Sequence, residues 1–103
     1  MQPDRATRRA VVRGALWLDA IRPDWFREIS LRILDLTDPC TCILGQLYGE
    51  ETSEQSGYTR GKIAFGANEA AMARLGFNGP GVLFSTPLWK NEVRKRRYKG
   101  DAK

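Results

Sequence analysis

Residues 86–97, close to the C-terminus, read TPLWKNEVRKRR. Thr86 followed by a proline predicts a helix start, with Thr86 as the N-cap and the proline in the first turn, where its N–H is not needed. Leu88, Trp89 and Val93 then form a narrow apolar stripe on a helix whose other faces are almost entirely cationic. The pattern predicts a terminal helix that packs through this stripe and exposes its charge.

A second amphipathic segment, residues 6–21, is the predicted packing partner of this helix. Its apolar residues recur at three- and four-residue spacing, and Pro23 ends it because the residue before a proline avoids helical angles. We expect the first and last helices to pack together through Val12, Leu16, Leu88, Trp89 and Val93. The arginines of the first helix lie on its opposite side, so the basic outer faces of the two helices should merge into one cationic surface.

The chain between these two helices contains signals for shorter ones. Asp38, which precedes a proline, and Asn68 are good N-caps. The expected helices are 39–48, 58–65 and 69–75, ended by Gly49, Gly66 and Gly76. The remaining expectations are a short turn at 24–29, an irregular or 3₁₀ segment at 29–36, a surface loop at 50–57, and a strand or buried connector at 82–84.

Length and composition indicate a single globular domain. The chain has 103 residues, of which 42% are hydrophobic and 28% charged, and this length leaves no room for a second core. The predicted fold class is mainly α: a small single-domain bundle, residues 1–103, of four or five short helices with long irregular connectors. The ends, 1–5 and 99–103, are expected to be flexible.

Charge is segregated along the chain. The net charge is +5 overall, with +3 in residues 1–13, +5 in residues 90–103 and −3 between them. The candidate binding residues are the cations of the two basic ends: Arg5, Arg9, Arg13, Lys90, Arg94, Lys95, Arg96, Arg97 and Lys99. Such a set suits phosphate contacts, which are electrostatic and need no base recognition. A solubilising tail and an acidic protein partner are the alternatives.

Most residue types that build catalytic sites are missing. The chain has no histidine, so it lacks the usual general base near neutral pH and the commonest metal ligand. No glycine pattern matches a phosphate-binding loop or a dinucleotide-binding turn. We therefore predict that the protein is not an enzyme, with no catalytic residues, no metal and no cofactor.

Cys40 and Cys42 are the only cysteines, separated by one residue. A disulfide between them would be strained, and two sulfurs without imidazole are too few for a structural zinc site. We expect free thiols, with Cys42 packed in the core, and keep a redox pair or half of a zinc site as the alternative. Nearby, Gly45 indicates close packing against another helix, such as the first; a pocket lined by Gln46 and Tyr48 is the alternative.

No stretch resembles a membrane span. The longest uncharged run, 75–89, contains three glycines and two prolines and could not form a continuous helix in lipid. The N-terminal arginines and apolar residues look superficially like a signal peptide, but Arg13 interrupts the apolar segment and Asp19 ends it. We therefore expect a cytoplasmic protein that does not contact a membrane.

Several segments spread over most of the chain form a recognisable set. They are Trp17-Leu18-Asp19, Arg22-Pro23-Asp24-Trp25, Leu34-Asp35-Leu36, Cys42-Ile43-Leu44-Gly45-Gln46-Leu47-Tyr48-Gly49, Gly57-Tyr58, Leu75-Gly76-Phe77, and Leu88-Trp89 with the basic tail. Together they resemble a group of small uncharacterised proteins of actinobacteria and their bacteriophages. No activity is established for that group, so the resemblance implies a biological setting and no chemistry.

These observations lead to two functional hypotheses. The first is a small non-enzymatic interaction protein, an accessory factor of a phage or an actinobacterium that binds a host or phage protein. The alternative is a nucleic-acid-binding protein that uses the basic terminal helices. The sequence leaves self-association open.

Overall fold

The computed structural model describes residues 4–49, 56–64, 66, 68–79 and 81–101. In this part of the chain, five α-helices and two 3₁₀ helices follow one another and no strand occurs. In order they are α1 (Arg5–Ile21), η1 (Trp25–Glu28), α2 (Ile43–Tyr48), α3 (Gly57–Ala64), α4 (Glu69–Arg74), η2 (Val82–Phe84) and α5 (Thr86–Asp101). The predicted mainly α fold class is confirmed. Residues 82–84 form neither the strand nor the buried connector expected there, because they are a 3₁₀ helix with no buried residue.

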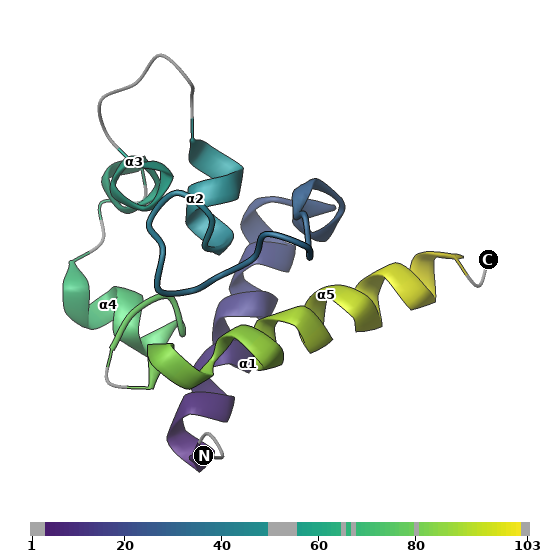
Figure 1. Ribbon diagram of the computed structural model, residues 1–103, viewed down its shortest axis with the longest axis horizontal. Helices are drawn as coiled ribbons and strands as arrows, with labels where there is room; N and C mark the ends of the chain where they lie inside the picture. The colour runs from purple at the N-terminus through teal and green to yellow at the C-terminus, as the bar shows by residue number, and fades with distance from the viewer. Residues whose placement is uncertain (1–3, 50–55, 65, 67, 80, 102–103) are drawn as a thin grey trace.

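Two long helices, α1 and α5, cross at the centre of the fold (Figure 1). Asp4 caps α1, its carboxylate accepting a hydrogen bond from the backbone N–H of Thr7 at 2.7 Å. On α5, Trp89 and Val93 are fully buried as predicted, while Leu88 is partly buried. Thr86 is the first residue of α5 rather than its N-cap, and its hydroxyl accepts a hydrogen bond from the N–H of Leu36.

The face that α1 buries differs from the predicted one. Val11, Ala15 and Leu18 lie in the core, whereas Val12 and Leu16 are 43% and 59% exposed. The expected packing of Val12 and Leu16 against α5 is therefore wrong. The physical reason is Gly14, whose missing side chain lets α1 lie directly on the carbonyl of Leu75 and the ring of Trp89. Val12 and Leu16 each lie two residues from Gly14, about 200° around the helix axis, so this contact turns both of them away from the core.

The helix predicted at 39–48 begins four residues later, at Ile43. Asp38 caps a turn instead, because its carboxylate accepts from the N–H of Cys40 and its carbonyl from the N–H of Cys42. Cys42 is the actual N-cap of α2, and its sulfur accepts from the N–H of Gly45 at 3.2 Å. The predicted end at Gly49 is confirmed.

Helices α2 and α3 meet through glycines. A Cβ on Gly57 would lie 2.2 Å from the carbonyl oxygen of Gly45, and a Cβ on Gly45 would lie 2.5 Å from the backbone of Cys40. The close-packing interpretation of Gly45 is thus confirmed, with α3 and the preceding turn as partners rather than α1. Of the loop expected at 50–57, residues 50–55 lie outside the described part of the chain.

Helix α4 agrees closely with its prediction. Asn68 caps it by accepting from the N–H of Ala71 at 2.9 Å, and Leu75 ends it. Gly76 follows at φ +77°, a left-handed conformation that glycine adopts without the penalty of a Cβ. This turn sends Phe77 back into the core, where it is 3% exposed.

An aromatic cluster joins the elements. The rings of Trp25 and Trp89, both completely buried, meet edge-to-face at 5.9 Å, and Phe77 stacks on Trp89 at 5.2 Å. Trp89 also donates its indole N–H to the carbonyl of Gly76 at 2.9 Å. The radius of gyration, 12.9 Å, is close to the roughly 13 Å expected of one domain of this length. Of the ends expected to be flexible, 1–3 and 102–103 lie outside the described residues, and 99–101 belong to α5.

Candidate interaction surfaces

The candidate cations of α5 divide into structural and unpaired residues. Arg96 is structural: its guanidinium donates to both carboxylate oxygens of Asp19 at 2.9 Å and to the Glu92 carboxylate at 2.9 Å. It also lies over the ring of Trp25, at 5.6 Å. The hydrogen bond from Arg96 is the main reason that the pKa of Asp19 is lowered from its ordinary value, and a second bond from the Trp25 indole adds to it.

Arg97 is structural as well. Its guanidinium donates to the backbone carbonyls of Phe26, at 3.0 and 3.2 Å, and of Ile29. Phe26 belongs to η1 and Ile29 is the residue that follows it. Arg97 therefore holds the second half of α5 against the C-terminal end of η1. Lys95 pairs with Glu92 at 3.0 Å, and the Lys95 side chain stays largely exposed.

Lys90, Arg94 and Lys99 have no ion pair or side-chain hydrogen bond to any other described residue. Arg94 and Lys99 are exposed, as is the ring of Tyr98 between them in sequence. These residues therefore carry the cationic character of α5 that is available to a partner.

A second exposed surface lies on α1. It combines four arginines with the two aliphatic residues that the core does not take up, and we call it the α1 surface: Arg5, Arg8, Arg9, Val12, Arg13 and Leu16. Its first five members line a shallow groove of about 350 Å³. Within the described chain none of the four arginines has an acidic partner, and Arg13 donates to the carbonyl of Arg74 at 3.1 Å.

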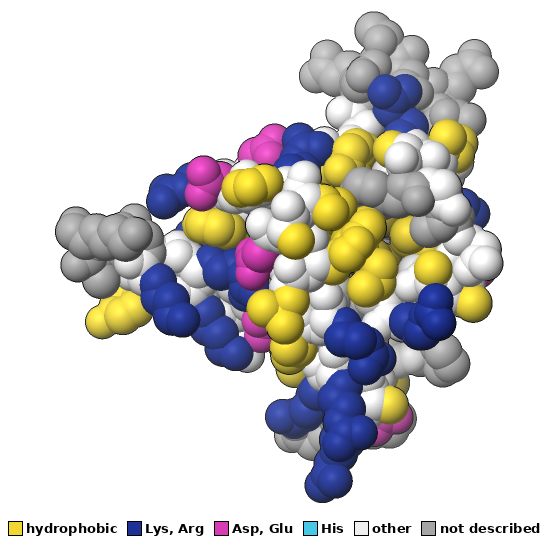
Figure 2. Space-filling view, turned by 180° about the vertical axis from the view of Figure 1, so that it is seen from behind, with side chains coloured by type: hydrophobic (Ala, Val, Ile, Leu, Met, Phe, Trp, Pro, Cys, Tyr) yellow, Lys and Arg dark blue, Asp and Glu magenta, His cyan; other side chains and the backbone are white. Residues whose placement is uncertain are grey.

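The two basic groups lie apart. Asp19, near the end of α1, bonds to Arg96 in the second half of α5, while Gly14 lies against Trp89 and Thr7 against Gly81. The helices therefore run in the same general direction, which places the first turns of α1 far from the last turns of α5. Figure 2 shows Lys and Arg side chains gathered at the bottom and at the left, with hydrophobic and acidic side chains between them. The predicted merging into one cationic surface is wrong.

Arg8, Val12 and Leu16 belong to this surface but not to the predicted set of binding residues. One sequence signal points to Val12 and Leu16: the first helix carries more aliphatic residues than one face can bury, so some of them must be exposed. Which ones are exposed depends on Gly14 and its tertiary contacts, and periodicity alone does not decide that.

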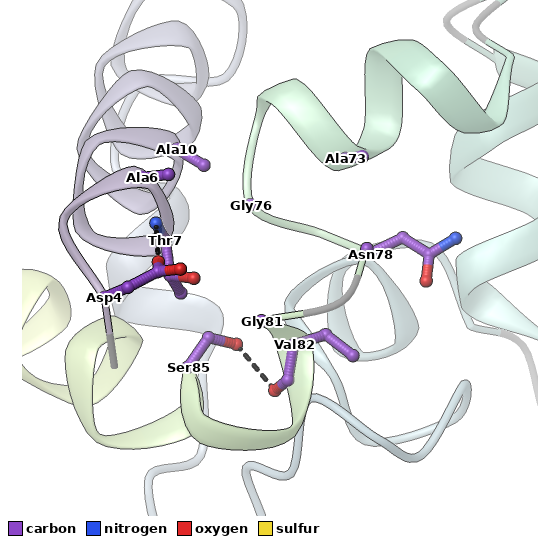
Figure 3. Close-up of a pocket in the computed structure, with 11 residues that line it drawn as sticks. Asp4, Ala6, Thr7, Ala10, Ala73, Gly76, Asn78, Gly81, Val82 and Ser85 are labelled. Carbon is purple, nitrogen blue, oxygen red and sulfur yellow. Dashed lines mark hydrogen bonds between the residues drawn. The ribbon is translucent and has the colours of Figure 1, made fainter. Parts of the chain in front are cut away.

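A small pocket of about 180 Å³ lies between the start of α1, the turn after α4 and η2 (Figure 3). Two of its polar side chains form hydrogen bonds with nearby backbone groups: the Asp4 carboxylate accepts from the N–H of Thr7, and the Ser85 hydroxyl donates to the carbonyl of Val82 at 2.9 Å. The Asn78 amide points away from the pocket, toward the carboxylate of Glu69. The side chains of Asp4, Ser85 and Asn78 are thus engaged by other groups of the chain.

The two cysteines are free thiols, Cys40 exposed and Cys42 buried. Burial raises the pKa of Cys42 to about 11, so this thiol stays protonated at neutral pH. Across the described part of the chain, no group of three or more His, Cys, Asp or Glu residues is placed to hold a metal ion.

Glu69 joins α3 to α4 through a polar network. Its carboxylate accepts from the Tyr58 hydroxyl at 2.9 Å and pairs with Lys62 at 2.6 Å. Burial, followed by the bond to Glu69, raises the pKa of Tyr58, so its hydroxyl acts as a hydrogen-bond donor and not as a base. The network stabilises the helix pair.

Comparison of the chain with models of protein families, with curated proteins and with solved structures finds no match in any of the three. Among the described residues, no helix has the length and apolar character that crossing a membrane requires.

Proposed function

We propose that this chain is a small non-enzymatic interaction protein that docks onto another protein. The observation that carries the proposal is the α1 surface, where Val12 and Leu16 are exposed among arginines. Folding leaves these two side chains in water, and their burial against a partner would stabilise a complex, as interfaces gain most from a few apolar anchors at their centre.

The non-enzymatic part of the proposal is supported by the residues available. The chain has no histidine, and Cys42 is buried with a raised pKa. Tyr58 and Glu69 are residue types that serve as acid and base in other sites, but here Glu69 bonds to both the Tyr58 hydroxyl and Lys62. These arrangements engage Tyr58 and Glu69 in the fold and keep Cys42 protonated, so none of these three described residues is a nucleophile activated by an adjacent base.

The proposed setting follows from the resemblance carried by the sequence. We place the protein among the accessory factors of an actinobacterium or its bacteriophage, with a host or phage protein as the partner. Two free thiols agree with a reducing compartment such as the cytoplasm.

Affinity purification from cells expressing the tagged protein, with and without nuclease, tests this function. We expect a protein partner in stoichiometric amount that survives nuclease treatment. Recovery of nucleic acid alone, or of a partner lost on nuclease treatment, would contradict it.

The alternative function, nucleic-acid binding, is favoured by Lys90, Arg94 and Lys99, which form no ion pair with another described residue. It predicts affinity for duplex or single-stranded DNA that falls steeply with salt, since each phosphate contact releases a counterion. The informative variant is Arg94→Gln with Lys99→Gln, because Arg96 and Arg97 hold α5 in place and their loss would weaken the fold itself. Binding that ignores both salt and this variant would remove the alternative.

A further inference from the structure

The α1 surface has the dimensions and pattern of a helix-binding site. Arg5, Arg9, Val12 and Leu16 follow one another at spacings of four, three and four residues, so they lie in one row along the helix. The row spans about 16 Å, roughly three helical turns. Arg8 and Arg13 stand beside it, one on each side of Val12 in sequence. The aliphatic pair is therefore flanked by positive charge.

The pattern favours an α-helix over an extended strand as the occupant. Helix α1 satisfies its backbone groups internally and presents no sheet edge to which a strand could add. Val12 and Leu16, four residues apart, form one of the ridges that pack into the groove of a second helix. A partner helix of about three turns would cover the row from Arg5 to Leu16.

The charge of the surface sets the character of that helix. Covering the surface removes water from the arginines, and none of them has a carboxylate among the described residues to compensate. The partner must therefore supply carboxylates on both sides of its own apolar residues. Asp or Glu at helical spacing beside two or three aliphatic residues meets this requirement.

Three other occupants fit the surface less well. A lipid surface needs a broad apolar face with bulky residues, and this row exposes only a valine and a leucine next to arginines. Nucleic acid would use the arginines but would leave Val12 and Leu16 in water. A second copy of the chain would bring the arginines of two α1 helices together.

We propose that the α1 surface binds an acidic amphipathic α-helix of another protein, with Val12 and Leu16 as the apolar anchors and the flanking arginines paired to its carboxylates. This inference rests on the proposed function, because it specifies the partner of the same surface.

A synthetic peptide probe tests the proposal directly. The probe is a capped helical peptide of about 14 residues, roughly four turns, with leucines at four-residue spacing between glutamates. Its control has the same composition in an order that puts leucine and glutamate on different faces. Backbone amide shifts of the labelled protein should change in a saturable way over residues 5–16 with the probe and not with the control.

Matched variants separate the anchors from general effects. The double variant Val12→Gln/Leu16→Gln should lower the affinity for the probe at least about tenfold. Both sites are exposed, so the circular dichroism spectrum should show that the fold persists. Leu83→Gln, at another exposed aliphatic residue, should change nothing. The double variant Arg5→Gln/Arg9→Gln should lower the affinity for the probe and make that affinity less dependent on salt. The control Arg94→Gln/Lys99→Gln removes the same amount of charge and should leave the affinity and its salt dependence unchanged.

Several results would overturn the inference. Equal affinity for probe and control would do so, as would chemical-shift changes located away from α1. The inference would also fail if phosphatidylglycerol vesicles, duplex DNA or self-association saturated the α1 shifts at a lower concentration than the probe. In affinity purification, a partner retained equally by wild type and by Val12→Gln/Leu16→Gln would refute this surface while leaving the proposed function intact. A wild-type protein that retains no protein partner would refute the proposed function, and the peptide measurement would still decide the chemistry of the surface.

Discussion

Cys40 and Cys42 lie two positions apart and differ in their exposure to solvent. Cys40 is exposed, whereas Cys42 is 2% exposed and its pKa is raised to about 11. A thiol reagent attacks the thiolate and needs access to it. In native protein at pH 8, Ellman's reagent should therefore modify one thiol rapidly and the second only in denaturant. Cys40→Ser should abolish the fast reaction, and two fast thiols would contradict the burial of Cys42.

Asp19 links three elements through one carboxylate. It accepts from the Arg96 guanidinium of α5 and from the indole N–H of the buried Trp25. The Asp19 side chain is 40% exposed, so solvent weakens these interactions. Asp19→Asn should lower the free energy of unfolding by about 1 to 2 kcal/mol, measured by urea titration at pH 7. Asp24→Asn removes the same charge from an exposed carboxylate 3.6 Å from Arg27 and should cost less than about 0.5 kcal/mol.

The same carboxylate predicts a pH dependence. Since Arg96 lowers the pKa of folded Asp19 below its ordinary value, ionised Asp19 stabilises the fold above that value. The contribution is lost as pH falls through the lowered pKa, below about pH 4. The gap in unfolding free energy between wild type and Asp19→Asn should therefore narrow from pH 6 toward the acid range. A gap that stays constant would show that Asp19 acts without its charge.

At the scale of elements, Gly14 determines how α1 lies on the core. Alanine normally stabilises a helix interior by about 1 kcal/mol relative to glycine, but a Cβ here would lie 1.9 Å from the carbonyl oxygen of Leu75. That oxygen belongs to the backbone and cannot move without displacing the end of α4. Gly14→Ala should lower the free energy of unfolding by about 3 kcal/mol.

A reciprocal substitution on the same helix serves as the control. Ala20 is exposed on α1, so Ala20→Gly should cost only the difference in helix propensity, about 1 kcal/mol. The two substitutions thus test whether Cβ at position 14 is unfavourable while Cβ at position 20 is favourable. A stabilising Gly14→Ala would mean that α1 does not contact the Leu75 carbonyl.

Sequence reasoning was most reliable where a signal is local. Asn68 begins α4 as its N-cap, and Gly76 follows its end with a positive φ. Both signals are local, so no distant contact is needed to recognise them. The start of α2 was missed because Asp38 can cap a turn or a helix with the same carboxylate, and the turn was formed. Cysteine is a rare N-cap in place of the usual oxygen side chains, so Cys42 gave no recognisable signal.

The candidate site was predicted less well, for a tertiary reason. A run of cations on α5 has the same appearance whether its members face water or the core. The structure uses Arg96 and Arg97 to hold η1 and leaves Arg94 exposed. Likewise, Val12 and Val11 are equally apolar in sequence, and only the contact at Gly14 selects Val11 for the core.

At the scale of the whole molecule, one hydrophobic cluster joins four of the described α-helices, and Tyr58 of α3 packs against it. It includes Leu18 of α1, Leu44 of α2, Met72 of α4 and Trp89 of α5. A single connected core of this kind should unfold in one cooperative transition. Tryptophan fluorescence tests this cooperativity because it reports on only part of the molecule. Trp17, Trp25 and Trp89 lie in α1, η1 and α5, and no tryptophan lies in α2, α3 or α4.

Gly57→Ala places a perturbation where no tryptophan is present. Its Cβ would lie 2.2 Å from the carbonyl oxygen of Gly45, so it should force α3 away from α2 and lower stability by about 2 kcal/mol. In one cooperative unit, tryptophan fluorescence and far-ultraviolet circular dichroism should shift to the same lower denaturant midpoint. If α2 and α3 unfolded separately, the circular dichroism signal would fall at low denaturant while the tryptophan midpoint stayed at its wild-type value. That result would contradict a single cooperative core.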